Sequence, residues 1–177
     1  MSKLGKNYDA SKVKWEEFDL MLLEGIDLIE LTLEDKLFLE KFTALENLNL
    51  SNTNLRSLKN MPVLPTLSRL DLSDNNLNGE DLHQINACFK KMKALGLANN
   101  EIRKYEFVAL LSKCTNLRTL DLSANPITDM NNYRSNIFEK LTQIASLDGF
   151  DQEGSECSYE DPDIYRYDDF QFCDNEF

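Results

Sequence analysis

The sequence predicts an α/β solenoid in which short parallel strands stack into one sheet and the returning segments cover its back. Two observations predict this fold. The pattern Leu-x-x-Leu-x-Leu-x-x-Asn-x-Leu is complete from Leu117 to Ile127, with Asn125 at its polar position. The same pattern recurs upstream at intervals typical of solenoid repeats, which are about 20–29 residues long. Leucine is common, so the prediction rests on the recurrence and not on one match.

Four copies of the pattern align on their first apolar position, and their starts are spaced 22, 25 and 25 residues apart. Alternating leucines in each copy predict a short strand whose apolar side chains face inward while the intervening side chains face outward. Stacked copies then form a parallel sheet on the concave face of a right-handed solenoid of leucine-rich repeats. The four copies begin at Leu45, Leu67, Met92 and Leu117.

Weaker copies at the two ends predict the caps of the solenoid, because an end coil has only one neighbour to pack against. Leu28 opens an upstream copy that has Lys36 in the asparagine position. Ile144 opens a downstream copy in which Gly149 marks a closing turn. Residues 11–23 have apolar side chains at helical spacing, which predicts a helical N-terminal cap.

One domain at residues 1–151, followed by an acidic aromatic tail at 152–177, accounts for the whole chain. Two prolines argue against a long helix at 56–66. Apolar side chains at helical spacing predict helices on the back of the sheet, within 79–91, 104–113 and 133–141. The repeats are expected near 28–44, 45–66, 67–91, 92–116 and 117–143, with the C-terminal cap at 128–151.

Composition restricts the classes of function. The chain has 177 residues and a net charge of -12, so basic proteins are expected as partners and nucleic acid is not expected as a direct one. No apolar run approaches the roughly 20 residues of a membrane helix, and the start lacks the apolar core of a signal peptide. Scattered cysteines predict free thiols in a reducing compartment. They are Cys88, Cys114, Cys157 and Cys173.

Residues 151–177 differ in composition from the repeats. They contain ten acids and one base, a net charge of -9, together with six aromatic side chains. One interpretation is a solvated acidic tail. The other is an interaction segment, in which the aromatic side chains anchor and the acids steer, or which folds back onto its own domain.

The register of the repeats places many acids on the concave face. We expect an electronegative groove that binds a basic protein segment and whose binding weakens with salt. The alternative is a solvated polar surface without a partner. The expected concave residues are Glu30, Glu34, Asp35, Asn49, Asp71, Asp74, Asn99, Asp121, Asp148 and Asp151.

The residues give no indication of an enzyme. His83 is the only histidine, and we expect it on the solvated surface of a helix, where no nucleophile or further metal ligand accompanies it. The sequence has no glycine-rich phosphate loop, and the paired acids Asp168 and Asp169 lie in the tail without an apolar pocket. We therefore predict no catalytic residue, no metal and no cofactor.

The chain resembles the acidic leucine-rich nuclear phosphoproteins of the pp32 type over roughly residues 28–151. The resemblance is carried by the segment from Asn125 to Phe138, by Leu147-Asp-Gly-Phe-Asp151 and by Leu70-Asp-Leu-Ser-Asp-Asn75. It implies a non-enzymatic protein, nuclear and cytoplasmic, that binds core histones and inhibits both histone acetylation and protein phosphatase type 2A. We expect a monomer.

Similar caps occur in a spliceosomal leucine-rich protein, a dynein light chain and a regulator of phosphatase one. These similarities imply an alternative function as a leucine-rich adaptor subunit of a spliceosomal RNA–protein complex or of a dynein motor. Such an adaptor would bind a partner helix or domain on the same concave face. The acidic composition and the small number of repeats favour the pp32 type.

Overall fold

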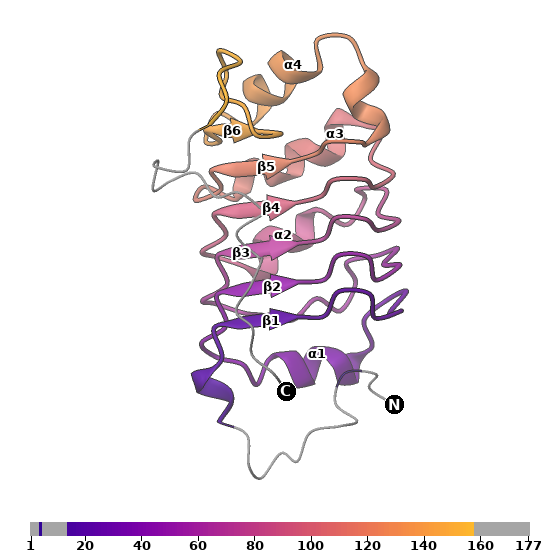
Figure 1. Ribbon diagram of the computed structural model, residues 1–177, viewed down its shortest axis with the longest axis vertical. Coiled ribbons are helices and arrows are strands. Elements are labelled where there is room, and N and C mark those ends of the chain that lie inside the picture. Colours follow the sequence, from indigo (N-terminus) through magenta and orange to yellow (C-terminus); the bar gives the residue numbers. More distant parts are fainter. Residues whose placement is uncertain (1–3, 5–13, 158–177) are drawn as a thin grey trace.

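Six parallel strands form one sheet whose order follows the sequence (Figure 1). A computed structural model describes Leu4 and residues 14–157 of the chain, so the predictions for the tail beyond Cys157 lie outside the described residues. The predicted solenoid with a parallel sheet is confirmed. The strands are β1 (Leu20–Leu22), β2 (Asn47–Asn49), β3 (Arg69–Asp71), β4 (Ala94–Gly96), β5 (Thr119–Asp121) and β6 (Ser146–Leu147).

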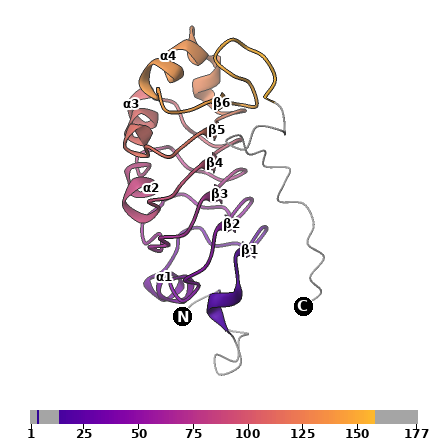
Figure 2. The same ribbon diagram turned by 90° about the vertical axis from the view of Figure 1, so that its left-hand side faces the viewer.

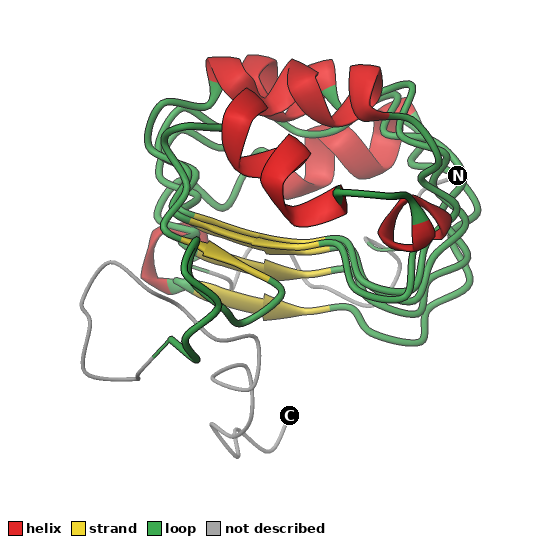
Figure 3. Cartoon of the chain, turned by 90° about the horizontal axis from the view of Figure 1, so that it is seen from above, coloured by secondary structure: helices red, strands yellow, loops and turns green. Residues whose placement is uncertain are grey.

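Helices cover one side of this sheet and leave the other side as the concave face (Figures 2 and 3). The segments predicted as helical contain α2, α3 with η2, and α4, and the described stretch 56–66 contains no helix. The α-helices are α1 (Leu33–Leu39), α2 (His83–Cys88), α3 (Tyr105–Val108) and α4 (Tyr133–Lys140). The 3-10 helices are η1 (Trp15–Glu17), η2 (Ala109–Lys113) and η3 (Pro126–Asp129).

The core is a stack of leucines between the sheet and the helices. The middle residues of β2 to β5 pair in register across the sheet, and each of them is fully buried. Burying one leucine contributes about 1.5–3 kcal/mol, provided that the next coil covers it. These residues are Leu48, Leu70, Leu95 and Leu120.

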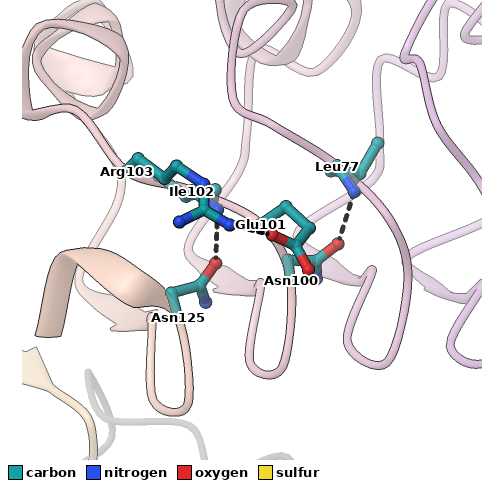
Figure 4. A network of polar contacts seen from close by, with 6 residues as sticks. All are labelled: Leu77, Asn100, Glu101, Ile102, Arg103 and Asn125. Atoms are coloured by element: carbon teal, nitrogen blue, oxygen red, sulfur yellow. Dashed lines mark hydrogen bonds and ion pairs between the residues drawn. The ribbon is translucent and has the colours of Figure 1, made fainter.

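Buried asparagines join the third, fourth and fifth coils each to the coil before it (Figure 4). The Asn100 amide donates to the carbonyls of Leu97 and Ala98 in its own coil, at 3.1 Å each. It also donates to the Leu72 carbonyl in the preceding coil, at 3.0 Å. Asn125 repeats this arrangement one coil later, with its Oδ1 accepting from the Ile102 amide at 2.9 Å. Buried backbone groups are satisfied in this way where the coils turn.

The first coil differs from the sequence prediction. Its strand is β1, whereas the copy predicted to begin at Leu28 contains α1 instead of a strand. Thr32 and Asp35 form a reciprocal capping box that begins this helix. The helix predicted over 11–23 is also wrong where the chain is described, because η1 and β1 occupy that stretch.

Aromatic side chains close the N-terminal end of the core. Trp15 packs edge-on against Phe38 and Phe42, with ring centroids 5.7 and 4.9 Å apart. Phe18 packs against Phe42 in the same way at 5.8 Å. The indole of Trp15 therefore packs in the N-terminal cap.

The C-terminal end is closed by a turn after β6. Asp148 and Gly149 have φ angles of 54° and 84°, and glycine adopts such angles without steric cost. Arg134 of α4 fixes this turn by donating to the Leu147 carbonyl at 2.9 Å and to the Asp151 carbonyl at 2.7 Å. The predicted closing turn at Gly149 is confirmed.

Candidate functional site on the concave face

The third residues of β2 to β5 form one row across the concave face. Parallel pairing places Asn49 beside Asp71, and places Gly96 between Asp71 and Asp121. Strands in a sheet lie about 4.8 Å apart, so the two carboxylates of the row are about two strand spacings apart. Gly96 contributes no side chain of its own between them, and its backbone is buried.

Each polar side chain in this row is held by its own chain. The Oδ1 atoms of Asn49 and Asp71 accept hydrogen bonds from the amides two residues later, at 2.7 and 2.9 Å. Asp121 Oδ1 accepts from both the amide and the hydroxyl of Ser123, at 2.9 and 2.7 Å. These bonds fix the side chains before any partner arrives, so binding does not have to order them.

Burial and like charge shape the electrostatics of the row. Asp71 is only 8% exposed, and Asp121 is partly exposed. Burial raises the pKa of Asp71, and the charges of Asp121 and Asp74 raise it further, while the hydrogen bonds from Ser73 lower it. Carboxylates that gather around Asp71 in this way create a negative potential that a cation relieves.

Asp74 and Asn99 lie in the loops that follow β3 and β4. Both are exposed and both have left-handed backbone conformations, with φ angles of 56° and 50°. Asn99 Nδ2 donates to Asp74 Oδ1 at 2.6 Å. This bond extends the polar row beyond the edge of the sheet at which the strands end.

Asp148 and Asp151 belong to the C-terminal cap as much as to the concave face. Asp148 accepts hydrogen bonds from the Leu122 amide at 2.7 Å and from the Tyr133 hydroxyl at 3.0 Å. Burial raises the pKa values of both Asp148 and Tyr133. Asp151 Oδ1 accepts from the Ser155 amide at 2.7 Å. Both acids therefore also have a structural role.

Three of the expected concave acids lie elsewhere, because the first strand is β1. Glu30 is exposed in the turn before α1, and Glu34 is exposed on the first turn of that helix. Asp35 is 1% exposed, and its carboxylate accepts from the Leu4 and Thr32 amides at 3.3 and 3.0 Å. The acidic part of the concave face therefore begins at the third coil.

The first coil instead presents apolar side chains that the sequence reasoning missed. Leu20 and Leu22 pair in register with Asn47 and Asn49, and Leu22 is 49% exposed. A signal for this register exists in the sequence, where Phe18, Met21 and Leu23 have the same spacing as Leu45, Leu48 and Leu50. The concave face is thus apolar at its N-terminal end and acidic beyond it.

No cluster of three metal-ligating side chains lies in the described part of the chain. Within the same residues, no helix is both long and apolar enough to cross a membrane. Cys88, Cys114 and Cys157 are buried free thiols, and burial raises the pKa of Cys114 to about 11. A thiol that stays protonated at neutral pH is a poor nucleophile.

Comparison with known proteins agrees with this geometry. A family model described as leucine-rich repeat matches residues 38–155. The chain belongs to this family. Its similarity to acidic leucine-rich nuclear phosphoproteins of the pp32 type is confirmed by the relatives that match it.

These relatives are acidic leucine-rich nuclear phosphoprotein 32 proteins. Family member A of Drosophila pseudoobscura pseudoobscura is 38% identical over 124 residues, which is 70% of this chain and 46% of that protein. Family member A of Drosophila melanogaster is 40% identical over 112 residues, 63% of this chain and 42% of that protein. A related protein of Plasmodium falciparum is 33% identical over 143 residues, 80% and 51% of the two chains. The chain thus spans about half the length of these relatives.

A solved structure supports the fold. A chain in the crystal structure of the Drosophila melanogaster SNF/U2A' complex superposes with a TM-score of 0.65 at 23% sequence identity. The likeness covers 79% of this chain and 75% of that one. It extends over most of the solenoid.

Proposed function

We propose that this chain is a non-enzymatic scaffold that binds basic segments of other proteins, core histones among them, on the acidic part of its concave face. The observation that carries the proposal is the row in which Asp71 and Asp121 lie on either side of Gly96. A lysine or arginine side chain inserted there would meet two oriented carboxylates. It would also relieve their mutual repulsion.

The names of the relatives support a nuclear location. They are called nuclear phosphoproteins, and histones are the abundant basic proteins of the nucleus. Asp74, Asp148 and Asp151 extend the negative charge along the edge of the sheet. The presence of the chain in the cytoplasm as well is part of the proposal.

Charge substitution tests the histone proposal. In the triple variant Asp71→Asn, Asp74→Asn and Asp121→Asn the side chains keep their shape and lose their charge. We expect its dissociation constant for core histones to rise about tenfold or more at 0.1 M salt. The difference should shrink at 0.5 M salt, because exposed charges are then screened within a few ångströms.

A matched variant neutralises three exposed acids away from the row. The control carries Glu30→Gln, Glu34→Gln and Glu153→Gln, and it should bind histones within about twofold of the parent chain. Both variants should keep the parent's circular dichroism spectrum. Equal weakening by the two triple variants would show that only net charge matters and would refute a site on the concave face.

Inhibition of protein phosphatase type 2A is the second part of the proposal, and it rests only on the resemblance to the pp32 type. Titration of purified type 2A phosphatase with this chain up to micromolar concentrations tests it directly. A decrease in phosphatase activity supports the proposal. Unchanged activity over that range would remove inhibition from the proposed function and leave the histone proposal untouched.

The apolar first coil favours a second candidate function, that of an adaptor subunit. Leu22 and Ile26 are exposed beside the polar face, and such a boundary suits a partner with both apolar and charged side chains. Affinity capture from extract at two salt concentrations separates the candidates. Capture of histones that is lost at high salt supports the scaffold. A spliceosomal or dynein subunit retained at high salt, and lost in Leu22→Asp, supports the adaptor.

A further inference from the structure

A ladder of backbone hydrogen bonds runs along the edge of the sheet at which the strands begin, the edge that faces the viewer in Figure 2. The residue before each strand donates its amide to the carbonyl of the equivalent residue in the preceding coil, over 2.7–2.9 Å. Side chains on this ladder change from acidic to basic along the solenoid. In order they are Asp19, Glu46, Ser68, Lys93, Arg118 and Ala145.

Further bases gather around the basic half of the ladder. The Asn116 amide donates to the Lys90 carbonyl at 3.0 Å, and Arg118 Nη1 donates to the Gln143 carbonyl at 3.1 Å, so three successive coils meet here. We call this group of bases the basic edge; it comprises Lys90, Lys91, Lys93, Lys113, Arg118 and Lys140. Its five lysines are all exposed.

The basic edge is positively charged, whereas the net charge of the chain is negative. The protein carries a net charge of -12, yet six bases are concentrated on one side of coils four to six. The concave face, by contrast, carries acids. Asp71 and Asp121 are the third residues of their strands, and Asp74 lies in the loop that follows β3. The two surfaces therefore attract ligands of opposite charge.

The chain contains a segment of complementary charge. Residues 158–177 hold seven acids and one base, together with six aromatic side chains. Cys157, the residue before this segment, is fixed to the domain, because its amide donates to the Gly149 carbonyl at 2.9 Å. Twenty residues in an extended chain reach up to about 66 Å. The strands of coils four to six lie within only about 10 Å of one another, so the segment is long enough to reach all three coils.

We propose that residues 158–177 bind the basic edge of their own domain. Tethering gives such a segment an effective concentration of roughly millimolar, so weak pairs between exposed charges are enough to hold it. The carboxylates of Asp71, Asp121 and Asp148 repel the same segment from the acidic part of the concave face. The acidic segment thus binds on one side of the solenoid while the concave row stays open for a basic partner. This inference does not depend on the proposed histone binding.

A nitroxide on Cys173 tests the proposal in the full chain. The buried thiols of Cys88, Cys114 and Cys157 should not react, which mass spectrometry verifies. We expect the amide resonances of Lys90, Lys113 and Lys140 to lose more than half their intensity at low salt. They should recover at 0.5 M salt, where charges are screened. Broadening centred instead on the amides of β1 to β3, or no localised broadening, would overturn the proposal.

Charge reversal supplies the matched control. The variant Lys90→Glu, Lys91→Glu and Lys113→Glu should abolish the broadening. The variant Lys41→Glu and Lys59→Glu, which changes exposed lysines of other coils, should leave it intact. A mixture of labelled nitroxide-free chains and unlabelled nitroxide-bearing chains should show no broadening. Broadening in that mixture would indicate binding between two copies and would refute binding within one chain.

Discussion

Asn100 Oδ1 accepts a hydrogen bond from the backbone amide of Leu77 at 2.9 Å, although the two residues belong to different coils (Figure 4). The Asn100 amide group donates to three carbonyls as well, so one side chain satisfies four backbone groups, of which the Ala98 carbonyl is partly buried and the others are buried. Its loss leaves those groups without partners in a site that is closed to water.

Asn100→Ala should therefore lower the free energy of unfolding by about 2–4 kcal/mol, as measured by urea denaturation. Asn76→Ala is the matched control, because Asn76 is exposed in the neighbouring coil, and it should change the free energy by less than about 0.5 kcal/mol. Equal effects of the two substitutions would contradict the role of the buried amide.

Asp71→Asn should raise the free energy of unfolding at neutral pH by about 1 kcal/mol or less. Burial raises the pKa of Asp71 in the folded protein, so the folded state binds more protons than the unfolded state between the two pKa values. The parent chain then gains stability as the pH falls through that interval, and the advantage of the asparagine shrinks.

Urea titrations at several pH values between 7 and 4 measure this difference. The amide oxygen of the substituted side chain would still accept the hydrogen bond from the Ser73 amide, so the change isolates the charge. Glu153→Gln, which removes an exposed carboxylate, serves as the control. An advantage of Asp71→Asn that grows towards acidic pH would reverse the sign and refute the explanation by burial.

Tyr133→Phe should cost about 0.5–1.5 kcal/mol of stability, because it removes the hydrogen bond from the Tyr133 hydroxyl to Asp148. Tyr105→Phe is the natural control. The Tyr105 hydroxyl is buried and has no hydrogen-bond partner, so its removal should be neutral or stabilising. Thermal unfolding of the two variants should therefore shift in different directions or by clearly different amounts. Equal losses would exclude a specific contribution of the bond to Asp148.

Gly79→Ala should be more destabilising than Gly154→Ala. Both glycines have left-handed φ angles, of 93° and 87°, so both substitutions strain the backbone by roughly 1 kcal/mol. A Cβ at Gly79 would also lie 3.2 Å from Cβ of Phe107, whereas one at Gly154 meets nothing within 4 Å. The difference between the unfolding free energies of the two variants measures the cost of the contact between the added Cβ and Phe107. A difference of zero would show that Phe107 moves away without cost.

The repeats could be predicted from the sequence because their leucines occupy the same positions from Leu45 onward. The first coil could not be predicted in the same way. Phe18 and Met21 stand where later coils have leucine or methionine, and Ile26 stands at the asparagine position of the repeat. The predicted position of Glu34 and Asp35 on the concave face is wrong for that reason, although the capping pair Thr32 and Asp35 indicates a helix start.

Charges on the concave face were only partly predictable. Register alone placed Asp71 and Asp121 in one row. The burial of Asp71 depends on neighbouring coils, and the bond from Tyr133 to Asp148 joins residues whose approach is decided by how α4 packs on the last strand. Contacts of this kind depend on tertiary packing, which a repeat pattern does not specify.

Thr53 stands where the later coils have an asparagine, and its hydroxyl donates to the Leu50 carbonyl of its own coil at 2.8 Å. In the next coil, Asn75 reaches back to the same carbonyl at 2.9 Å. The shorter threonine forms no such bond to the first coil among the described residues, whereas Asn75, Asn100 and Asn125 each donate to a carbonyl of the preceding coil. Hydrogen exchange should therefore be fastest in β1 and α1 and slowest around β4, with the array fraying from its amino-terminal end.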